Sequence, residues 1–241
     1  MKIITLLLAF LATQCWAAER PRIVFISGEY EYHSKETLPE YAKELERQFD
    51  VQTTVLARPE DEKKHTISGL DALKDADLVV LYVRRMTLPE EELAQIKKYL
   101  EAGKPLVALR TSSHAFETWK EFDREVLGGN YKNHYGNKLK TSVSIVPSAK
   151  ESPLLTGVSA FVSDGSLYKN TPLQPGAKPF LIGQVEGHAP EPVAWTHSFK
   201  ANRVFYTSLG HPNDFKEESF RNLLRNGIAW ALQRPLEAKR K

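Results

Sequence analysis

The chain has 241 residues, 41% of them hydrophobic, and its 33 Lys and Arg nearly balance 30 Asp and Glu to give a net charge of +3. These numbers indicate a globular protein with a substantial core, and a basic cluster confined to residues 239–241 argues against a nucleic-acid partner. The only cysteine, Cys15, lies in the N-terminal apolar segment, which excludes a disulfide, a thiolate metal ligand and a cysteine nucleophile from the rest of the chain.

The N-terminus has the three parts of a secretory signal: Lys2, an apolar run over residues 3–12, and small residues up to Ala18. The run is shorter than the roughly 20 residues of a membrane-spanning helix. We therefore expect a signal peptide over residues 1–18, export to the periplasm or the exterior, no membrane span, and a single domain over residues 19–241.

The first half of the chain alternates apolar runs with helical patterns. The runs predict buried strands at residues 22–28, 51–56, 77–83 and 105–109. The tetrapeptide Thr-Leu-Pro-Glu occurs at 37–40 and again at 87–90, where Thr as a cap and Pro in the first turn predict the start of a helix. Gly103 is placed to end the second helix in a left-handed conformation.

The second half has shorter apolar runs separated by Pro and Gly. These runs predict strands at residues 141–146, 180–185, 193–197 and 204–207, followed by a closing helix over 217–233. The order of elements predicts an α/β fold: an open, mostly parallel sheet flanked by helices in a three-layer arrangement.

Polar side chains gather where the predicted strands end. Ligands of open parallel sheets bind beyond the carboxyl ends of the strands, because the loops converge there. The candidate residues after or at these ends, together with the loop around residue 134, are Tyr30, Tyr32, His33, Arg84, Arg110, Ser112, His114, Asn133, His134, His197, His211 and Asp214. Four of the seven histidines fall at strand ends, which predicts a functional pocket at this edge of the sheet.

Several of these stretches resemble the ThuA-like (trehalose-utilisation) family. The resemblance lies in residues 28–34, 109–116, 128–136, 192–197 and 203–212. The chain is similar to exported members of the family found in bacteria that degrade polysaccharides. The resemblance implies a class I glutamine amidotransferase-like fold, and a small carbohydrate ligand such as a trehalose-type disaccharide or a 3-keto sugar.

The resemblance also excludes glutaminase chemistry. Class I amidotransferases place a cysteine on a tight strand-to-helix turn and take their base from a later His-Pro-Glu segment. Here the turn at residues 110–114 reads Arg-Thr-Ser-Ser-His, and residues 210–213 read Gly-His-Pro-Asn. His211 is therefore retained without the thiol and without the Glu.

The first hypothesis is an enzyme that acts on sugars. His211, His114 and His33 would serve as general acid and base on an oxidised sugar, because imidazole titrates near neutral pH and a ring carbonyl acidifies the neighbouring carbon. Ser112, or its neighbour Thr111, could instead be a nucleophile with His211 as its base, although the Gly-x-Ser-x-Gly pattern is absent. The residues assigned to substrate binding are Tyr30, Tyr32, Arg84, Arg110, Asn133, His134, His197 and Asp214.

Two other hypotheses stay open. One is a site for a divalent metal such as Zn²⁺, with ligands far apart in the sequence. Its candidate ligands are His33, His114, His134 and His211, with Asp214. The other is a non-catalytic glycan-binding module, consistent with the missing cysteine. Paired carboxylates of a glycosidase are not evident, since Asp123, Glu125 and Asp164 are candidates by residue type alone.

Overall fold

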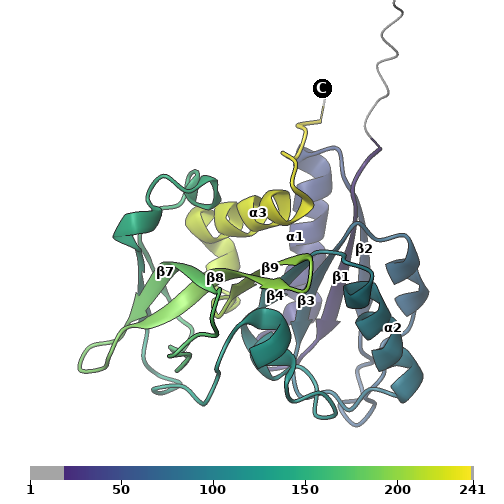
Figure 1. Cartoon of the computed structure of the whole chain (residues 1–241), viewed down its shortest axis with the longest axis horizontal. Helices are drawn as coiled ribbons and strands as arrows, with labels where there is room; N and C mark the ends of the chain where they lie inside the picture. Colours follow the sequence, from purple (N-terminus) through teal and green to yellow (C-terminus); the bar gives the residue numbers. More distant parts are fainter. Residues whose placement is uncertain (1–18, 240–241) are drawn as a thin grey trace, which may run out of the picture.

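The computed structural model describes residues 19–239 (Figure 1), so the signal-peptide prediction for residues 1–18 lies outside the described residues. Within this range nine strands form one sheet in the order β2-β1-β3-β4-β9-β8-β7-β5-β6. The strands are β1 (Arg22–Gly28), β2 (Gln52–Ala57), β3 (Leu78–Val83), β4 (Leu106–Leu109), β5 (Thr141–Ile145), β6 (Phe161–Ser163), β7 (Lys178–Gln184), β8 (Glu191–Phe199) and β9 (Asn202–Thr207). The three α-helices are α1 (Ser34–Gln48), α2 (Glu90–Glu101) and α3 (Glu218–Leu232).

One half of the sheet is parallel. Strands β2, β1, β3, β4 and β9 all run in the same direction. Every residue of β3 and of β4 is buried, as expected for strands covered on both faces. The four strands predicted from the first half of the sequence are confirmed, and so is the α/β fold class.

The other half of the sheet is antiparallel. Strand β8 runs against β9, with Ala194 opposite Thr207 and Phe199 opposite Asn202, and β7, β5 and β6 continue the antiparallel pairing. The carboxyl end of β8 therefore lies at the opposite edge from the carboxyl ends of the parallel strands. The expectation that His197 joins the other candidates at one edge is wrong for this reason.

Helices cover both faces of the sheet (Figure 1). Side chains alternate along β1, so that Ile23 and Phe25 pack in the same core as residues of α1 and α3. Val24 and Ile26 pack in a second core with residues of α2 and of the short helix Leu70–Lys74. The result is the predicted three-layer arrangement with a core on each side of the sheet.

The two helix starts differ from the prediction. Helix α1 begins at Ser34, one turn before Thr37, because the Glu29 carboxylate accepts the Ser34 N–H (2.7 Å) and caps the helix from outside it. Helix α2 begins at Glu90, with Pro89 rather than Thr87 at the N-cap. The prediction for Gly103 is confirmed, since it follows α2 with φ at 80°.

No helix among residues 19–239 combines the length and the apolar character needed to cross a membrane.

Candidate functional site

The loops after β1, β3, β4 and β9 meet at one edge of the sheet. At this edge β4 leads directly into the turn Arg110–His114, and Arg110 takes a left-handed backbone conformation with φ at 41°. Such a conformation is rare for residues other than Gly and persists where surrounding contacts enforce it. The Tyr206 hydroxyl supplies one such contact by donating to the Arg110 carbonyl (2.7 Å).

The Arg110 guanidinium is the hub of this edge. It is only 1% exposed and donates to the Ser208 carbonyl (2.8 Å), the Tyr32 hydroxyl (3.2 Å) and the Ser166 hydroxyl (3.2 Å). Its central carbon lies 4.1 Å from the centre of the Tyr32 ring and 4.8 Å from that of Tyr168. Aromatic faces and neutral acceptors thus hold the buried cation and fix the two tyrosines.

Aromatic rings extend from Arg110 in both directions. On one side the rings of Tyr168 and Tyr131 lie 4.6 Å apart, and Tyr131 stacks on His114 at 4.6 Å. On the other side Tyr32 meets His211 edge to face at 6.2 Å. We call this set the aromatic row: His211, Tyr32, Arg110, Tyr168, Tyr131 and His114. His211 and His114, two of the residues predicted to be catalytic, therefore lie at the two ends of the aromatic row.

His211 is fixed in one tautomer when neutral. Its Nδ1 accepts the Asn213 N–H (3.3 Å), so the ring proton resides on Nε2. Burial lowers the pKa of His211 below its ordinary value, which favours the neutral ring. Neutral His211 therefore offers a donor rather than an acceptor at Nε2.

Asp214 holds the loop that carries His211. Its Oδ2 accepts the N–H groups of Gly210 (2.8 Å) and His211 (3.0 Å) and the Ser163 hydroxyl (2.8 Å). Burial raises the pKa of Asp214. Asp214 is thus engaged in positioning the loop.

His114 is also neutral near physiological pH. Burial, reinforced by the nearby guanidinium groups of Arg84, Arg85 and Arg110, lowers the pKa of His114 to about 3. The Ser113 hydroxyl lies 3.1 Å from His114 Nδ1. His114 therefore presents an uncharged imidazole in surroundings rich in positive charge.

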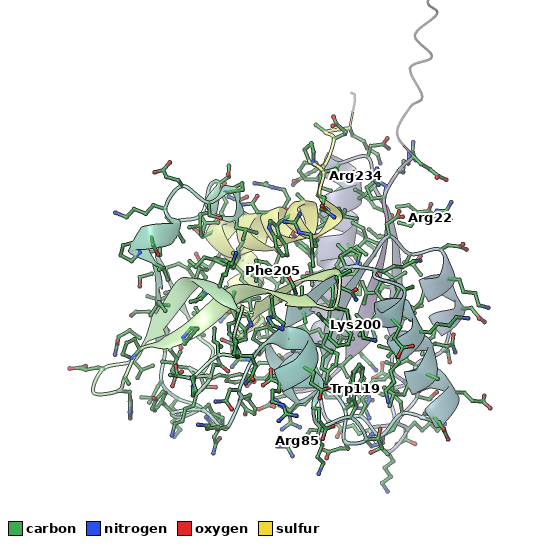
Figure 2. The ribbon with its side chains drawn as sticks, in the orientation of Figure 1. Arg22, Arg85, Trp119, Lys200, Phe205 and Arg234 are labelled. Carbon is green, nitrogen blue, oxygen red and sulfur yellow. The ribbon has the colours of Figure 1, made fainter. Side chains whose placement is uncertain are left out.

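A hollow of about 370 Å³ opens beside His114, and we call it the Trp119 hollow. Its apolar walls come from Phe116, Trp119 and Tyr131, and Asp123 lies in its wall. Figure 2 shows Trp119 and Arg85 at the same edge of the molecule. The remaining lining residues are Arg85, Ser113, His114, Ala115, Glu117, Lys120, Phe122, Arg124 and Asn130. Flat aromatic faces next to charged and amide groups suit a ring that bears hydroxyls.

A second hollow of about 420 Å³, the Tyr30 hollow, is also lined by Arg85. Tyr30 donates its hydroxyl to the Pro59 carbonyl, and Arg58 covers its ring at 4.3 Å. Arg84 enters this hollow and pairs with Glu31 (2.8 Å). The predicted residues Tyr30 and Arg84 are therefore already engaged with neighbours in this structure.

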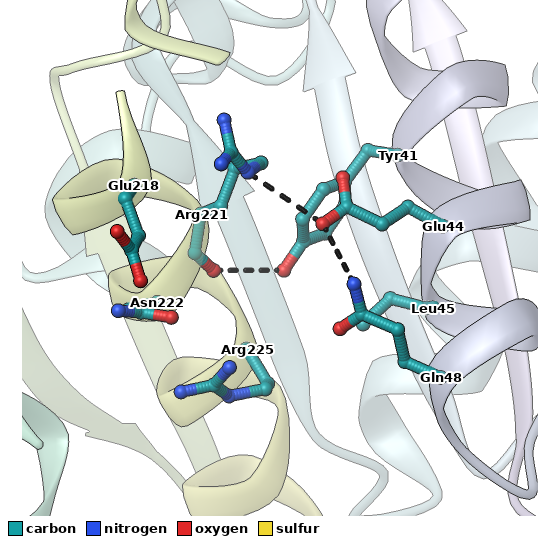
Figure 3. A pocket seen from close by; sticks show the side chains of 8 residues that line it. All are labelled: Tyr41, Glu44, Leu45, Gln48, Glu218, Arg221, Asn222 and Arg225. Carbon is teal, nitrogen blue, oxygen red and sulfur yellow. Dashed lines mark hydrogen bonds and ion pairs between the residues drawn. The ribbon is translucent and has the colours of Figure 1, made fainter. Parts of the chain in front are cut away.

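A third hollow, which we call the α1–α3 groove, lies between α1 and α3 (Figure 3). Its polar groups pair with one another: Arg221 with Glu44 (3.5 Å), Gln48 with Glu44 (3.1 Å), and the Tyr41 hydroxyl with the Arg221 carbonyl (3.1 Å). None of the residues predicted for the site lines it.

Some predicted residues do not join the aromatic row. Ser112 is fully buried, donates its hydroxyl to the Leu81 carbonyl (2.9 Å) and accepts the Val83 N–H (3.3 Å), so it is engaged in the β3 backbone. His33 and Asn133 are exposed. His197 packs against Gly128, away from the carboxyl edge.

The metal hypothesis finds no ligand set in the structure. Among residues 19–239, no three His, Cys, Asp or Glu side chains are grouped closely enough to hold a metal ion. His134 lies close enough to His114, and His33 close enough to His211, for each to affect the other's charge, but the four candidates do not form one ligand set among these residues. His134 instead pairs through its backbone with Tyr168.

Sequence reasoning did not select Tyr131, Tyr168, Ser166 or Trp119 for the site. Tyr131 lies in the loop that carried the family resemblance, which could have marked it. Tyr168 and Ser166 follow β6, a three-residue strand too short to predict. A Cβ atom at Gly165 would lie 2.6 Å from Arg110 Nη1, so the close packing of this loop on Arg110 favours glycine there. No pattern in the sequence predicts that the two segments meet.

Comparison with known proteins supports the family resemblance. A family model described as ThuA, trehalose utilisation, matches residues 22–231, and no curated protein matches the chain. A ThuA-like protein from Parabacteroides merdae superposes with a TM-score of 0.69 at 16% identity, covering 92% of this chain and 93% of that one. A ThuA-like protein from Bacteroides uniformis gives 0.67 at 17% identity, covering 90% and 94%.

The fold also occurs within larger proteins. A β-galactosidase from Rahnella sp. R3 matches 90% of this chain with 32% of its own, at a TM-score of 0.59 and 17% identity. At these identities the structural likeness concerns the fold.

Proposed function

Because the chain belongs to the ThuA family, whose description supports a carbohydrate-related role, we propose that it binds a small carbohydrate in the Trp119 hollow. We further propose that it catalyses the transfer of a proton to and from a carbon atom of that carbohydrate. The observation that carries the proposal is the meeting of three features in one place. The aromatic rings of Trp119 and Tyr131 and the neutral imidazole of His114 line the same hollow of about 370 Å³ at the carboxyl edge.

The chemistry we propose is acid–base catalysis on an oxidised sugar of the trehalose type. A neutral imidazole donates a hydrogen bond to a carbonyl oxygen, and this acidifies the carbon next to the carbonyl. His114 in the hollow is placed for that role, and His211 offers the equivalent donor at the other end of the aromatic row. Such chemistry needs no nucleophile, which agrees with the backbone hydrogen bonds of Ser112.

Calorimetric titration of the purified protein with trehalose and 3-keto-trehalose tests the binding. We expect Trp119→Ala and His114→Gln to weaken binding about tenfold or more, because each removes a wall or a donor of the hollow. Glu44→Gln in the α1–α3 groove is the matched control and should bind as the wild type does. Equal affinity in all four proteins would contradict the proposed site.

A binding-only module is the second candidate, favoured by the hydrogen bonds that occupy Ser112 Oγ and His211 Nδ1. Following conversion of 3-keto-trehalose by nuclear magnetic resonance, with and without a chelator, separates the alternatives. Turnover that His211→Ala or His114→Gln abolishes rules out the binding-only module, and turnover indifferent to the chelator counts against a metal requirement.

We further propose that the chain is exported, as the pattern of residues 1–18 predicts. Expression in a Gram-negative host followed by fractionation should recover a periplasmic protein whose N-terminal sequence starts at Glu19. Recovery from the cytoplasm with residues 1–18 intact would contradict export.

A further inference from the structure

Asp123 is a buried carboxyl group that the proposed function has not used. It opens the short π-helix Asp123–Leu127, is 7% exposed and contributes to the wall of the Trp119 hollow. Its Oδ2 accepts the Tyr131 N–H (2.7 Å), while its Oδ1 is buried and has no hydrogen-bond partner in the part of the chain that the structure describes. Buried polar atoms normally have partners, so a buried carboxyl oxygen without one indicates a group that is readily protonated.

Among residues 19–239, no Lys, Arg or His side chain forms an ion pair with Asp123. The neighbouring Arg124 pairs with Glu125 (3.6 Å) instead, and the Gly129 backbone packs closely over Oδ1. The titratable and charged groups that line the hollow together with Asp123 are Arg85, His114, Glu117, Lys120, Arg124 and Tyr131. Tyr206 of β9 lies close enough to Asp123 to be affected by its charge, and the exposed Glu125 lies on the same short helix.

Burial raises the pKa of Asp123 to about 7. A group exchanges protons most effectively when its pKa lies close to the working pH. His114, with a pKa of about 3, is a weak base, and the Nδ1 of His211 is occupied by Asn213. Of these three groups, Asp123 is the best matched to proton transfer at neutral pH, with the histidines left as uncharged donors.

We infer that Asp123 is the residue that exchanges a proton with the carbohydrate bound in the Trp119 hollow, an inference that rests on the proposed function. The ionised carboxylate takes the proton from the carbon next to the sugar carbonyl. The C–H electron pair forms a carbon–carbon double bond, and the carbonyl π pair moves to oxygen as an enolate. His114 donates a hydrogen bond to that oxygen, and return of the proton from Asp123 reverses the step.

The test is the exchange of this carbon-bound hydrogen of 3-keto-trehalose for deuterium in heavy water, followed by nuclear magnetic resonance. With the wild type we expect the enzymatic rate, corrected for exchange without protein, to rise with pH through about 7 and then to level off. Asp123→Asn keeps an acceptor for the Tyr131 N–H but cannot take a proton. It should bind 3-keto-trehalose within about threefold of the wild type and exchange it about 100-fold more slowly. Glu125→Gln, at an exposed carboxylate of the same turn, is the control and should exchange normally.

The outcomes separate this inference from the proposed function. Exchange by Asp123→Asn at the wild-type rate, or a wild-type protein that binds the sugar without exchanging it, overturns the role of Asp123 while leaving the binding site in place. Failure of the wild type to bind either trehalose or 3-keto-trehalose overturns the proposed function and the role of Asp123 with it. An Asp123→Asn protein that cannot bind is checked with Asp123→Glu, which should restore both binding and pH-dependent exchange.

Discussion

Arg110 illustrates how far single residues could be interpreted from the sequence. Its position after a buried strand correctly marked the carboxyl edge, and its side chain was assigned to substrate binding. In the structure the Tyr32 and Tyr168 rings pack on the buried guanidinium, so that Arg110 connects the two arms of the aromatic row. Its neighbours come from segments far apart in the chain, and no local pattern encodes their meeting.

Asp123 was a candidate by residue type alone, for a physical reason. A carboxyl group becomes chemically distinct through what surrounds it, and here that is burial without a cation. The sequence predicts neither the burial of Asp123 nor its lack of an ion pair, because the adjacent Arg124 would be the expected partner. The histidines, which do titrate near neutrality in water, were favoured instead, and burial lowers the pKa of both His114 and His211.

Stability as a function of pH reports on Asp123 without any ligand. Because its pKa is raised from the ordinary 3.8 to about 7, the folded protein keeps a proton that the unfolded chain has released between these values. The free energy of unfolding of the wild type should thus fall relative to that of Asp123→Asn as pH rises from about 4, and level off above about 7. The full difference is about 4 kcal/mol.

Chemical denaturation of the two proteins at several pH values measures this difference. Glu125→Gln serves as the reference for an exposed carboxylate and should follow the wild type closely. A wild-type curve parallel to that of Asp123→Asn between pH 4 and pH 8 would contradict the raised pKa.

At the scale of elements, the long apolar strands and helices were predictable and the connections between them were not. Strands β1 and β3 are continuous apolar runs, and their burial on both faces follows directly from that pattern. The start of α1 was misplaced because the acceptor of its first N–H group is the carboxylate of Glu29, a residue outside the helical pattern. The direction of β8 was missed because an apolar run predicts a strand but says nothing of which way it runs.

These missed features matter for the site. The reversed direction of β8 removes His197 from the carboxyl edge, and the loop after the unpredicted β6 brings Ser166 and Tyr168 to Arg110. The sequence singled out His211, Tyr32, Arg110 and His114, four of the six residues of the aromatic row, from their places after parallel strands. Tyr131 and Tyr168 come from the connection between β4 and β5 and from the loop after β6.

At the scale of the whole molecule, the candidate site lies where the two halves of the sheet meet. Strand β9 is parallel to β4 on one side and antiparallel to β8 on the other. The parallel half contributes Tyr32, Arg110 and His114, and the segments around the antiparallel half contribute Tyr131 and Tyr168. The aromatic row therefore requires both halves to be folded, and the Trp119 hollow opens beside it.

The most direct test of the account is a crystal structure of the protein with 3-keto-trehalose bound. We predict a sugar ring in the Trp119 hollow, packed on Trp119 or Tyr131, with oxygen atoms in hydrogen-bond reach of His114 and the reacting carbon beside the Asp123 carboxyl. A sugar bound instead in the Tyr30 hollow or the α1–α3 groove, or no bound sugar at a saturating concentration, would contradict it.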